Sequence, residues 1–180
     1  MSNSTLLMRR LRHYLFDSLG QKAYAVLDGC QIPQLPSWLE NNQIPCVCLF
    51  DSPLDPMLEA AAPQLVELTP DSPLLPALFT ENWGKPWGIF LLVPEQFELA
   101  QLRRYLRSIL MVRQPGGRSM LFRFYDPRSF KCVWANLNDE QRGALFGLVS
   151  AWLIEGDSPE QIIRFEPNTG RQGELLPLEP

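Results

Sequence analysis

The sequence contains a single histidine, and this limits the nucleophilic chemistry that the chain could perform. A catalytic serine or cysteine is usually activated by a histidine base. His13 would have to be that base, but helical spacing places it opposite the apolar stripe of Leu7, Leu11 and Tyr14. A solvent-facing histidine without a partner is a poor base. We therefore expect no catalytic triad.

Paired carboxylates are a second source of acid–base chemistry. Asp51 with Asp55, and Asp139 with Glu140, are close enough in the sequence to be considered. Both pairs lie where a turn or a helix is expected to begin, and acidic residues are favoured there as caps and by the helix dipole. We interpret them as structural.

Metal and nucleotide sites find little support in the sequence. The four cysteines have no CxxC spacing and are expected to be reduced and buried: Cys30, Cys46, Cys48 and Cys132. With one histidine they offer no convincing set of zinc ligands, and no glycine-rich phosphate loop or calcium loop is present. We expect no cofactor, no metal and no enzymatic activity.

The most informative polar string is FRFYDPR at residues 122–128. Apolar and charged positions alternate, so on a strand Arg123 and Tyr125 would share a face, with Asp126 and Arg128 at the strand exit. One interpretation is a structural bridge between Arg123 and Asp126 that clamps the turn. The alternative is an enzyme-like site for a small molecule or an anion, formed by these four polar residues.

Basic charge is concentrated in residues 103–131, which hold eight basic residues and one acidic residue, in a chain of net charge -4. The acidic total argues against a dedicated nucleic-acid-binding protein. On a helix, Arg103, Arg104 and Arg107 would lie mainly outside the buried stripe. These arginines either bind an acidic partner or balance the acidic remainder of the chain.

Hydrophobic periodicity predicts strands that alternate with helices. Short apolar runs indicate strands at 23–27, 45–50, 64–68 (an edge strand), 87–93 (a central strand), 120–125 after a Pro-Gly-Gly turn, and 162–165. Amphipathic or capped segments indicate helices at 7–19 before Gly20, 37–41, 56–62, from Pro94 to Ile109, and 138–153. Asn138, with Gln141 three residues later, resembles a capping box that opens the last of these helices. The expected fold is α/β, with a mixed sheet flanked by helices in a single domain that has room for a small helical subdomain.

Targeting signals are not evident at the start of the chain. The first residues lack the continuous apolar segment of a signal peptide, and no segment reaches the roughly 18 apolar residues of a membrane span. We expect a cytoplasmic protein that does not insert into membranes.

Four segments together resemble a known family. They are FRFYDPR at 122–128, YAVLDG at 24–29, CLFDSPLDPMLEAAAPQLVEL at 48–68 and LRRYLRSILMVRQPGGR at 102–118. Over residues 20–155 or so the chain is similar to the effector-loading chaperones, or adaptors, of bacterial type VI secretion, a family first catalogued as a domain of unknown function.

The resemblance implies a non-enzymatic bacterial cytoplasmic protein that binds a toxic effector and helps mount it on the valine-glycine-repeat spike protein. It carries over no catalytic residues. The family string falls on Arg123, Phe124, Tyr125, Asp126, Pro127 and Arg128, in either a structural or a contact role. Together with the basic helix face, this gives candidate partner-binding residues Arg103, Arg104, Arg107, Arg123, Tyr125, Asp126 and Arg128.

The same reasoning divides the chain into three parts. Residues 1–20 form an N-terminal amphipathic helix, residues 21–166 the adaptor domain, and residues 167–180 a flexible, proline-containing tail.

Overall fold

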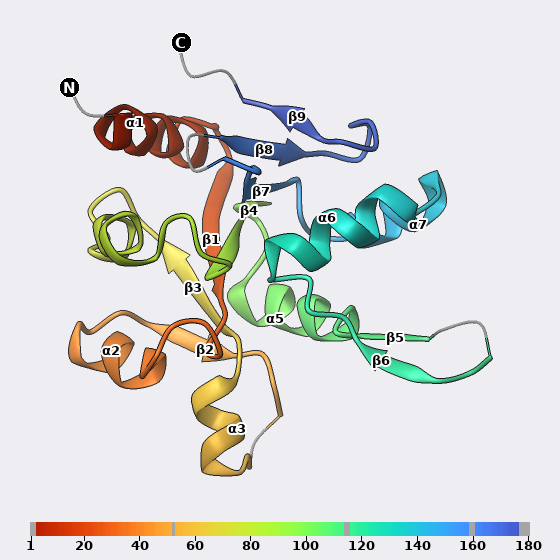
Figure 1. Ribbon diagram of the computed structural model, residues 1–180, viewed down its shortest axis with the longest axis horizontal. Helices are drawn as coiled ribbons and strands as arrows, with labels where there is room; N and C mark the ends of the chain where they lie inside the picture. Colours follow the sequence, from red (N-terminus) through yellow and green to blue (C-terminus); the bar gives the residue numbers. More distant parts are fainter. Residues whose placement is uncertain (1–2, 52, 114–115, 159–160, 177–180) are drawn as a thin grey trace.

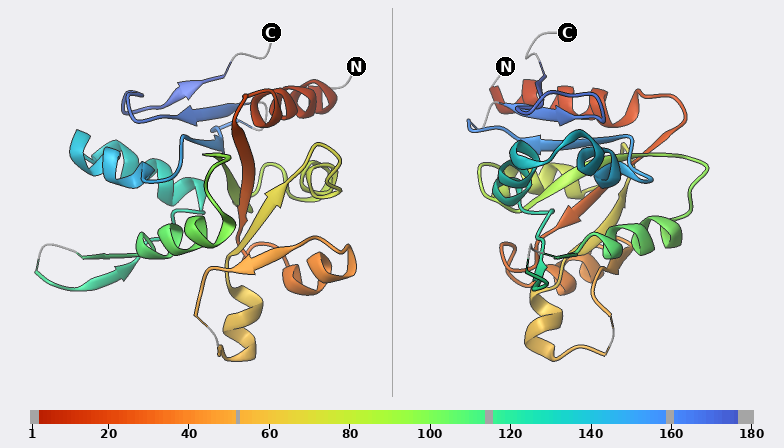
Figure 2. Two further views of the ribbon diagram at one scale, coloured as in Figure 1. Left: turned by 180° about the vertical axis from the view of Figure 1, so that it is seen from behind. Right: turned by 90° about the vertical axis from the view of Figure 1, so that its right-hand side faces the viewer.

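A seven-stranded sheet runs through the centre of the molecule, with helices on both of its faces (Figures 1 and 2). The computed structural model describes residues 3–51, 53–113, 116–158 and 161–176. The strand order is β2-β3-β1-β4-β7-β8-β9, and a separate two-stranded hairpin is formed by β5 and β6. The α/β class is confirmed. The described strand pairs are all antiparallel, so the expected mixture of parallel and antiparallel pairs is not found.

The elements have the following bounds. The strands are β1 (Gln21–Leu27), β2 (Cys46–Cys48), β3 (Gln64–Leu68), β4 (Gly88–Pro94), β5 (Met111–Arg113), β6 (Ser119–Leu121), β7 (Ala151–Glu155), β8 (Ile162–Phe165) and β9 (Glu174–Leu175). The helices are α1 (Asn3–Phe16), α2 (Leu35–Asn41), α3 (Pro56–Ala61), α4 (Leu74–Ala77), the π-helical turn η1 (Leu78–Asn82), α5 (Leu99–Ser108), α6 (Pro127–Asn136) and α7 (Asp139–Phe146).

Two hydrophobic cores lie on opposite faces of the sheet, because successive side chains of a strand point to opposite sides. In β1, Ala23 and Ala25 contribute to a core closed by α1, α2 and α4. Tyr24 and Val26 contribute to the other core, which is closed by α5, α6 and α7. Burial on both faces explains why β1 and β4 are nearly continuous apolar runs.

The expected central strand is confirmed, since β4 is the middle strand of the seven. The expected edge strand at 64–68 is wrong, because β3 pairs with β2 on one side and β1 on the other. The three-residue strand β2 lies outside β3 and takes the edge position.

Several predicted helix limits need correction. The first helix ends at Phe16, and Leu19 is 99% exposed rather than part of the buried stripe. Pro94 ends β4, and α5 begins at Leu99 behind a capping box formed by Glu98 and Gln101.

The predicted helix at 138–153 is a helix followed by a strand. Asn138 and Gln141 do form the expected capping box, but α7 stops at Phe146. Gly147 then has a φ of +46°, which favours glycine. The chain reverses there, so residues 151–155 join the sheet as β7 instead of continuing the helix.

Other parts of the chain also differ from expectation. Leu175 lies on β9, which pairs with β8, so this part of the predicted tail belongs to the sheet, and residues 177–180 lie outside the described residues. Pro115 of the predicted Pro-Gly-Gly turn is likewise outside them. The cysteines are free, but three are exposed and Cys48 is half-buried, so the expectation of burial is wrong. None of the described helices is long and apolar enough to cross a membrane.

Candidate functional site

The residues singled out in the sequence lie beside the end of β1, at the start of α6 and along α5. Arg123 forms an ion pair with the buried carboxylate of Asp28, the residue that follows β1. The other carboxylate oxygen of Asp28 accepts a hydrogen bond from the backbone N–H of Cys30, with an N···O distance of 3.0 Å. Asp28 thereby ties the loop after β1 to the segment before α6.

Tyr125 lies beside this ion pair, as its place near Arg123 in the sequence suggested. The Arg123 guanidinium carbon is 5.8 Å from the centre of the Tyr125 ring, within the range of a cation–π contact. Burial raises the pKa of the Tyr125 hydroxyl to about 12, with the charge of Asp28 acting in the same direction. Tyr125 is therefore a neutral, buried phenol rather than a candidate base.

Asp126 begins helix α6. Its carboxylate accepts a hydrogen bond from the backbone N–H of Arg128 at 2.9 Å, and Pro127 occupies the first turn. The Arg128 side chain contacts both carboxylate oxygens, from Nε at 3.0 Å and from a terminal nitrogen at 2.7 Å. This is an N-cap reinforced by a two-point ion pair.

The bridge expected between Arg123 and Asp126 is not formed, because Arg123 pairs with Asp28 and Asp126 with Arg128. The cause is a wrong assignment of local structure. Strand β6 ends at Leu121, and residues 124–126 form a turn into α6, which the sequence analysis missed. An aspartate followed by proline is a typical helix start and could have revealed it.

The aromatic residues of the string and of α6 pack in the core. Phe124 contacts Trp152 with ring centres 5.7 Å apart, and Phe130 contacts the same ring at 5.4 Å. Trp134 lies 5.2 Å from Phe165. All five are buried, so they stabilise the fold and are not available as interface anchors.

The three arginines of α5 divide into two kinds. Arg103 donates from Nε to the backbone oxygen of Cys48 at 2.8 Å and from a terminal nitrogen to the oxygen of Phe50 at 3.3 Å. Arg107 forms an ion pair with Asp51. Both therefore hold the segment that follows β2. Arg104 is exposed and forms no ion pair with another described residue.

A basic hollow accompanies these side chains. It has a volume of about 510 Å³ and is lined by Ala100, Arg103, Arg104, Arg107 and Ser108. The structure thus brings the α5 arginines together at one open depression, on a different element from the Arg123–Arg128 string.

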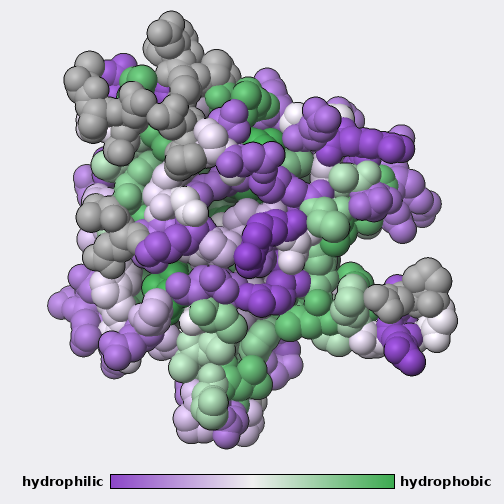
Figure 3. Space-filling model, in the orientation of Figure 1, coloured by the Kyte–Doolittle hydropathy of each residue, from purple (hydrophilic) through white to green (hydrophobic). Residues whose placement is uncertain are grey.

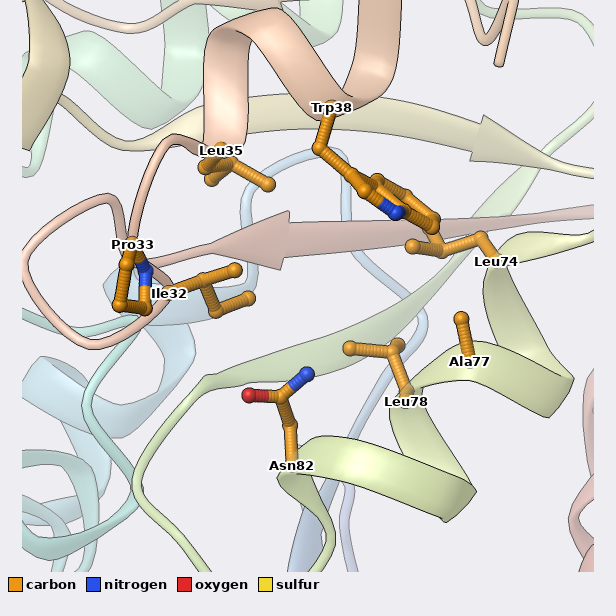
Figure 4. A pocket seen from close by; sticks show the side chains of 8 residues that line it. All are labelled: Ile32, Pro33, Leu35, Trp38, Leu74, Ala77, Leu78 and Asn82. Atoms are coloured by element: carbon orange, nitrogen blue, oxygen red, sulfur yellow. The ribbon is translucent and has the colours of Figure 1, made fainter. Parts of the chain in front are cut away.

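A smaller apolar pocket lies on the opposite face of the sheet, between α2 and α4, with a volume of about 250 Å³. Figure 4 shows Trp38 reaching from α2 towards Leu74, with the Asn82 amide directed into the space. The pocket is below the roughly 300 Å³ that is usual for sites that enclose drug-sized ligands.

Glu155, at the end of β7, is a buried acid that the sequence analysis did not single out. It accepts hydrogen bonds from the Trp87 indole N–H and from the backbone N–H of Gly84, the latter at 3.0 Å. Burial raises the pKa of Glu155 to about 7, although both hydrogen bonds and the charge of Lys131 oppose the rise. In the sequence Glu155 stands at the end of the apolar run WLIEG, and this position could have indicated a buried acid.

The remaining candidates have local partners. His13 lies on the exposed side of α1, but it does have a partner, with Nδ1 2.6 Å from Asp17 Oδ2. Asp55 caps α3 by accepting the Met57 N–H at 2.9 Å, as its position suggested. Asp139 lies in the first turn of α7. Among the described residues, His, Cys, Asp and Glu do not assemble into any group of three or more that could hold a metal.

One comparison with known proteins gives a match. The family model described as "Domain of unknown function (DUF4123)" matches residues 23–144, about two thirds of the chain. The match includes Asp28, helix α5 and the Arg123–Arg128 string. No match was found among curated proteins or among solved structures. The chain therefore belongs to the DUF4123 family, whose domain is described as one of unknown function.

Proposed function

We propose that the protein is a non-enzymatic adaptor of bacterial type VI secretion, which binds a toxic effector in the cytoplasm and helps load it onto the valine-glycine-repeat spike protein. The observation that carries the proposal is the family match over residues 23–144. It encloses all four segments by which the sequence resembles effector-loading chaperones.

The contacts of the FRFYDPR side chains favour a structural role for this string, which is one of the four segments that carry the resemblance. Arg123 and Asp126 each have a charged partner within the chain, Asp28 and Arg128 respectively. Tyr125 is buried. These contacts leave less free hydrogen-bonding capacity than a small-molecule or anion site would need, so the enzyme-like alternative has less support than the adaptor.

The surface offers a better candidate for partner binding on α5. Arg104 is exposed at the hollow that Arg103 and Arg107 also line. The exposed Arg104 can attract a carboxylate and make charge-assisted hydrogen bonds to it, while Arg103 and Arg107 add positive charge around the depression. An acidic patch on an effector is the partner chemistry that this hollow fits.

The test is co-expression of the tagged chain with the toxin and the spike protein encoded beside its gene. We expect a toxin gene and a spike gene as neighbours, co-purification of the toxin, and loss of toxin delivery to competitor cells when the adaptor gene is deleted. Delivery should return on complementation.

Two results would contradict the proposal. One is toxin delivery that is unchanged by the deletion. The other is turnover of a small substrate by the purified chain that survives repurification and disappears with Arg128→Ala, a variant that keeps the helix cap.

A further inference from the structure

The β5–β6 hairpin leaves the body of the molecule directly after α5 and projects to one side (Figure 1). Its base is anchored by the buried residues Leu110 and Phe122, which are joined by a hydrogen bond from the Phe122 N–H to the Leu110 oxygen at 2.7 Å. Beyond this base the two strands pair only with each other within the described chain.

One face of this hairpin combines exposed apolar side chains with an arginine. Met111 is directly opposite Leu121, and Arg113 is opposite Ser119. Residues two apart on a strand share a face, so these four side chains lie together. Met111 is 54% exposed and Leu121 43%. Arg113 is also exposed and forms no ion pair with a described residue. Figure 3 shows apolar surface at the base of the hairpin and over α3.

The backbone of β5 is open along its outer edge. In an antiparallel pair, hydrogen-bonded and non-hydrogen-bonded residue pairs alternate. The bond between Leu110 and Phe122 therefore makes Val112 with Met120 the next hydrogen-bonded pair. The N–H and C=O groups of Met111 and Arg113 point outward, away from β6. The two residues of β5 whose backbone groups point away from β6 are thus the two whose side chains share the apolar and basic face.

We infer that the outer edge of β5 receives an extended segment of the effector as a third strand, with an apolar side chain beside Met111 and a carboxylate, two residues along, beside Arg113. This inference rests on the proposed adaptor function. A two-stranded ribbon is at best marginally stable in water, and a third strand with a shared apolar face stabilises it. The exposed guanidinium of Arg113 selects an acidic segment by charge complementarity.

The hairpin's chemistry favours a protein segment over a lipid surface. A membrane-binding loop typically presents aromatic residues and a wide apolar face, whereas the exposed large apolar side chains of the described part of the hairpin are Met111, Met120 and Leu121, none of which is aromatic. The period of two between Met111 and Arg113 matches a strand.

The experiment compares effector binding by the full chain and three variants: the double variant Met111→Ser with Leu121→Ser, the variant Arg113→Glu, and Leu19→Ser. The last removes a fully exposed leucine beyond α1 and is the matched control. We expect the affinity for the toxin encoded beside the adaptor gene to fall at least tenfold in the double variant and in Arg113→Glu, and to stay unchanged in the Leu19→Ser control. All variants should keep the wild-type thermal midpoint, because the altered side chains are exposed. Hydrogen exchange of the Met111 and Arg113 amides should slow in the wild-type complex.

Three other outcomes would overturn the inference or show how it relates to the proposed function. A complex that forms with unchanged affinity in both hairpin variants overturns the inference and leaves the proposed function intact. No complex with the wild-type chain overturns both. The wild-type chain could also associate with itself or bind vesicles of phosphatidylglycerol and phosphatidylethanolamine. If the hairpin variants lose either property but still bind the effector, this face has another occupant and the inference is overturned.

Discussion

Arg123 and Asp28 are 95 residues apart in the sequence and form an ion pair between the end of β1 and the segment that leads into α6. The pair is asymmetric. The Asp28 side chain is fully buried, whereas that of Arg123 is 35% exposed. Loss of the arginine would leave a buried charge without a counter-charge, but loss of the carboxylate would leave a cation that water can still reach.

This asymmetry predicts unequal costs. Arg123→Met should lower the free energy of unfolding, by less than the roughly 3 to 5 kcal/mol expected when a fully buried ion pair loses one partner, because the Arg123 side chain is 35% exposed. Asp28→Asn should cost less, because the amide oxygen can still accept the Cys30 N–H. Urea denaturation measures both, and the double variant should recover part of the loss. Equal effects of the two single changes would contradict this account.

The N-cap of α6 gives a second prediction. Burial opposes ionisation of Asp126, but hydrogen bonds from the Arg128 side chain and backbone outweigh it and lower the pKa of Asp126. A carboxylate with a lowered folded-state pKa contributes stability above its unfolded pKa and loses it as the pH falls towards the folded value. Asp126→Ala should cost about 1 kcal/mol or more at neutral pH, and Asp126→Asn less.

Thermal melts at neutral and acidic pH test the cap. The difference between wild type and Asp126→Ala should shrink on acidification below the ordinary aspartate range. Arg128→Ala, which keeps the cap and removes a largely exposed side chain, should have a smaller effect than Asp126→Ala. A larger effect of Arg128→Ala would show that the ion pair, and not the cap, holds the helix start.

The raised pKa of Glu155 predicts that stability changes with pH in the opposite direction from the effect of Asp126. Burial raises its pKa from the ordinary 4.5 to about 7, so the folded protein binds this proton more tightly than the unfolded chain does. Stability should therefore fall as the pH rises from about 4.5 to about 7, by roughly 3 kcal/mol from this group. Denaturation at several pH values should show this loss in wild type and not in Glu155→Gln. Glu140→Gln, an exposed control, should leave the loss in place.

Substitutions of two α5 arginines, Arg104 and Arg103, should affect partner binding and thermal stability separately. Arg104→Glu should slow association with an acidic partner, most strongly at low salt, and leave the thermal midpoint unchanged, because this side chain is exposed. Arg103→Glu should instead lower the midpoint, since Arg103 bonds to the backbone after β2.

Arg9→Glu on α1 carries the same charge change on the other face of the sheet and is the control. If the association rate changes with neither salt nor Arg104→Glu, the basic residues of α5 balance acidic residues of the same chain and do not bind a partner.

Local patterns were sufficient for the elements whose signal is confined to a few neighbouring residues. The apolar run of β4 predicted a central strand, and Asn138 with Gln141 three residues later predicted the capping box at the start of α7. Both depend on short-range chemistry, namely side-chain burial and hydrogen bonds three residues apart.

The sequence by itself therefore determined the α/β class, most strand positions and the concentration of basic charge in residues 103–131. Tertiary structure decided the partners of Arg103, Arg107 and Arg123, whereas Arg128 pairs locally with Asp126. An ion pair between distant residues depends on which segments the fold brings together, and periodicity within a segment carries no information about that. This is why Arg123 pairs with Asp28 rather than with nearby Asp126, and why Arg103 is structural while Arg104 is exposed.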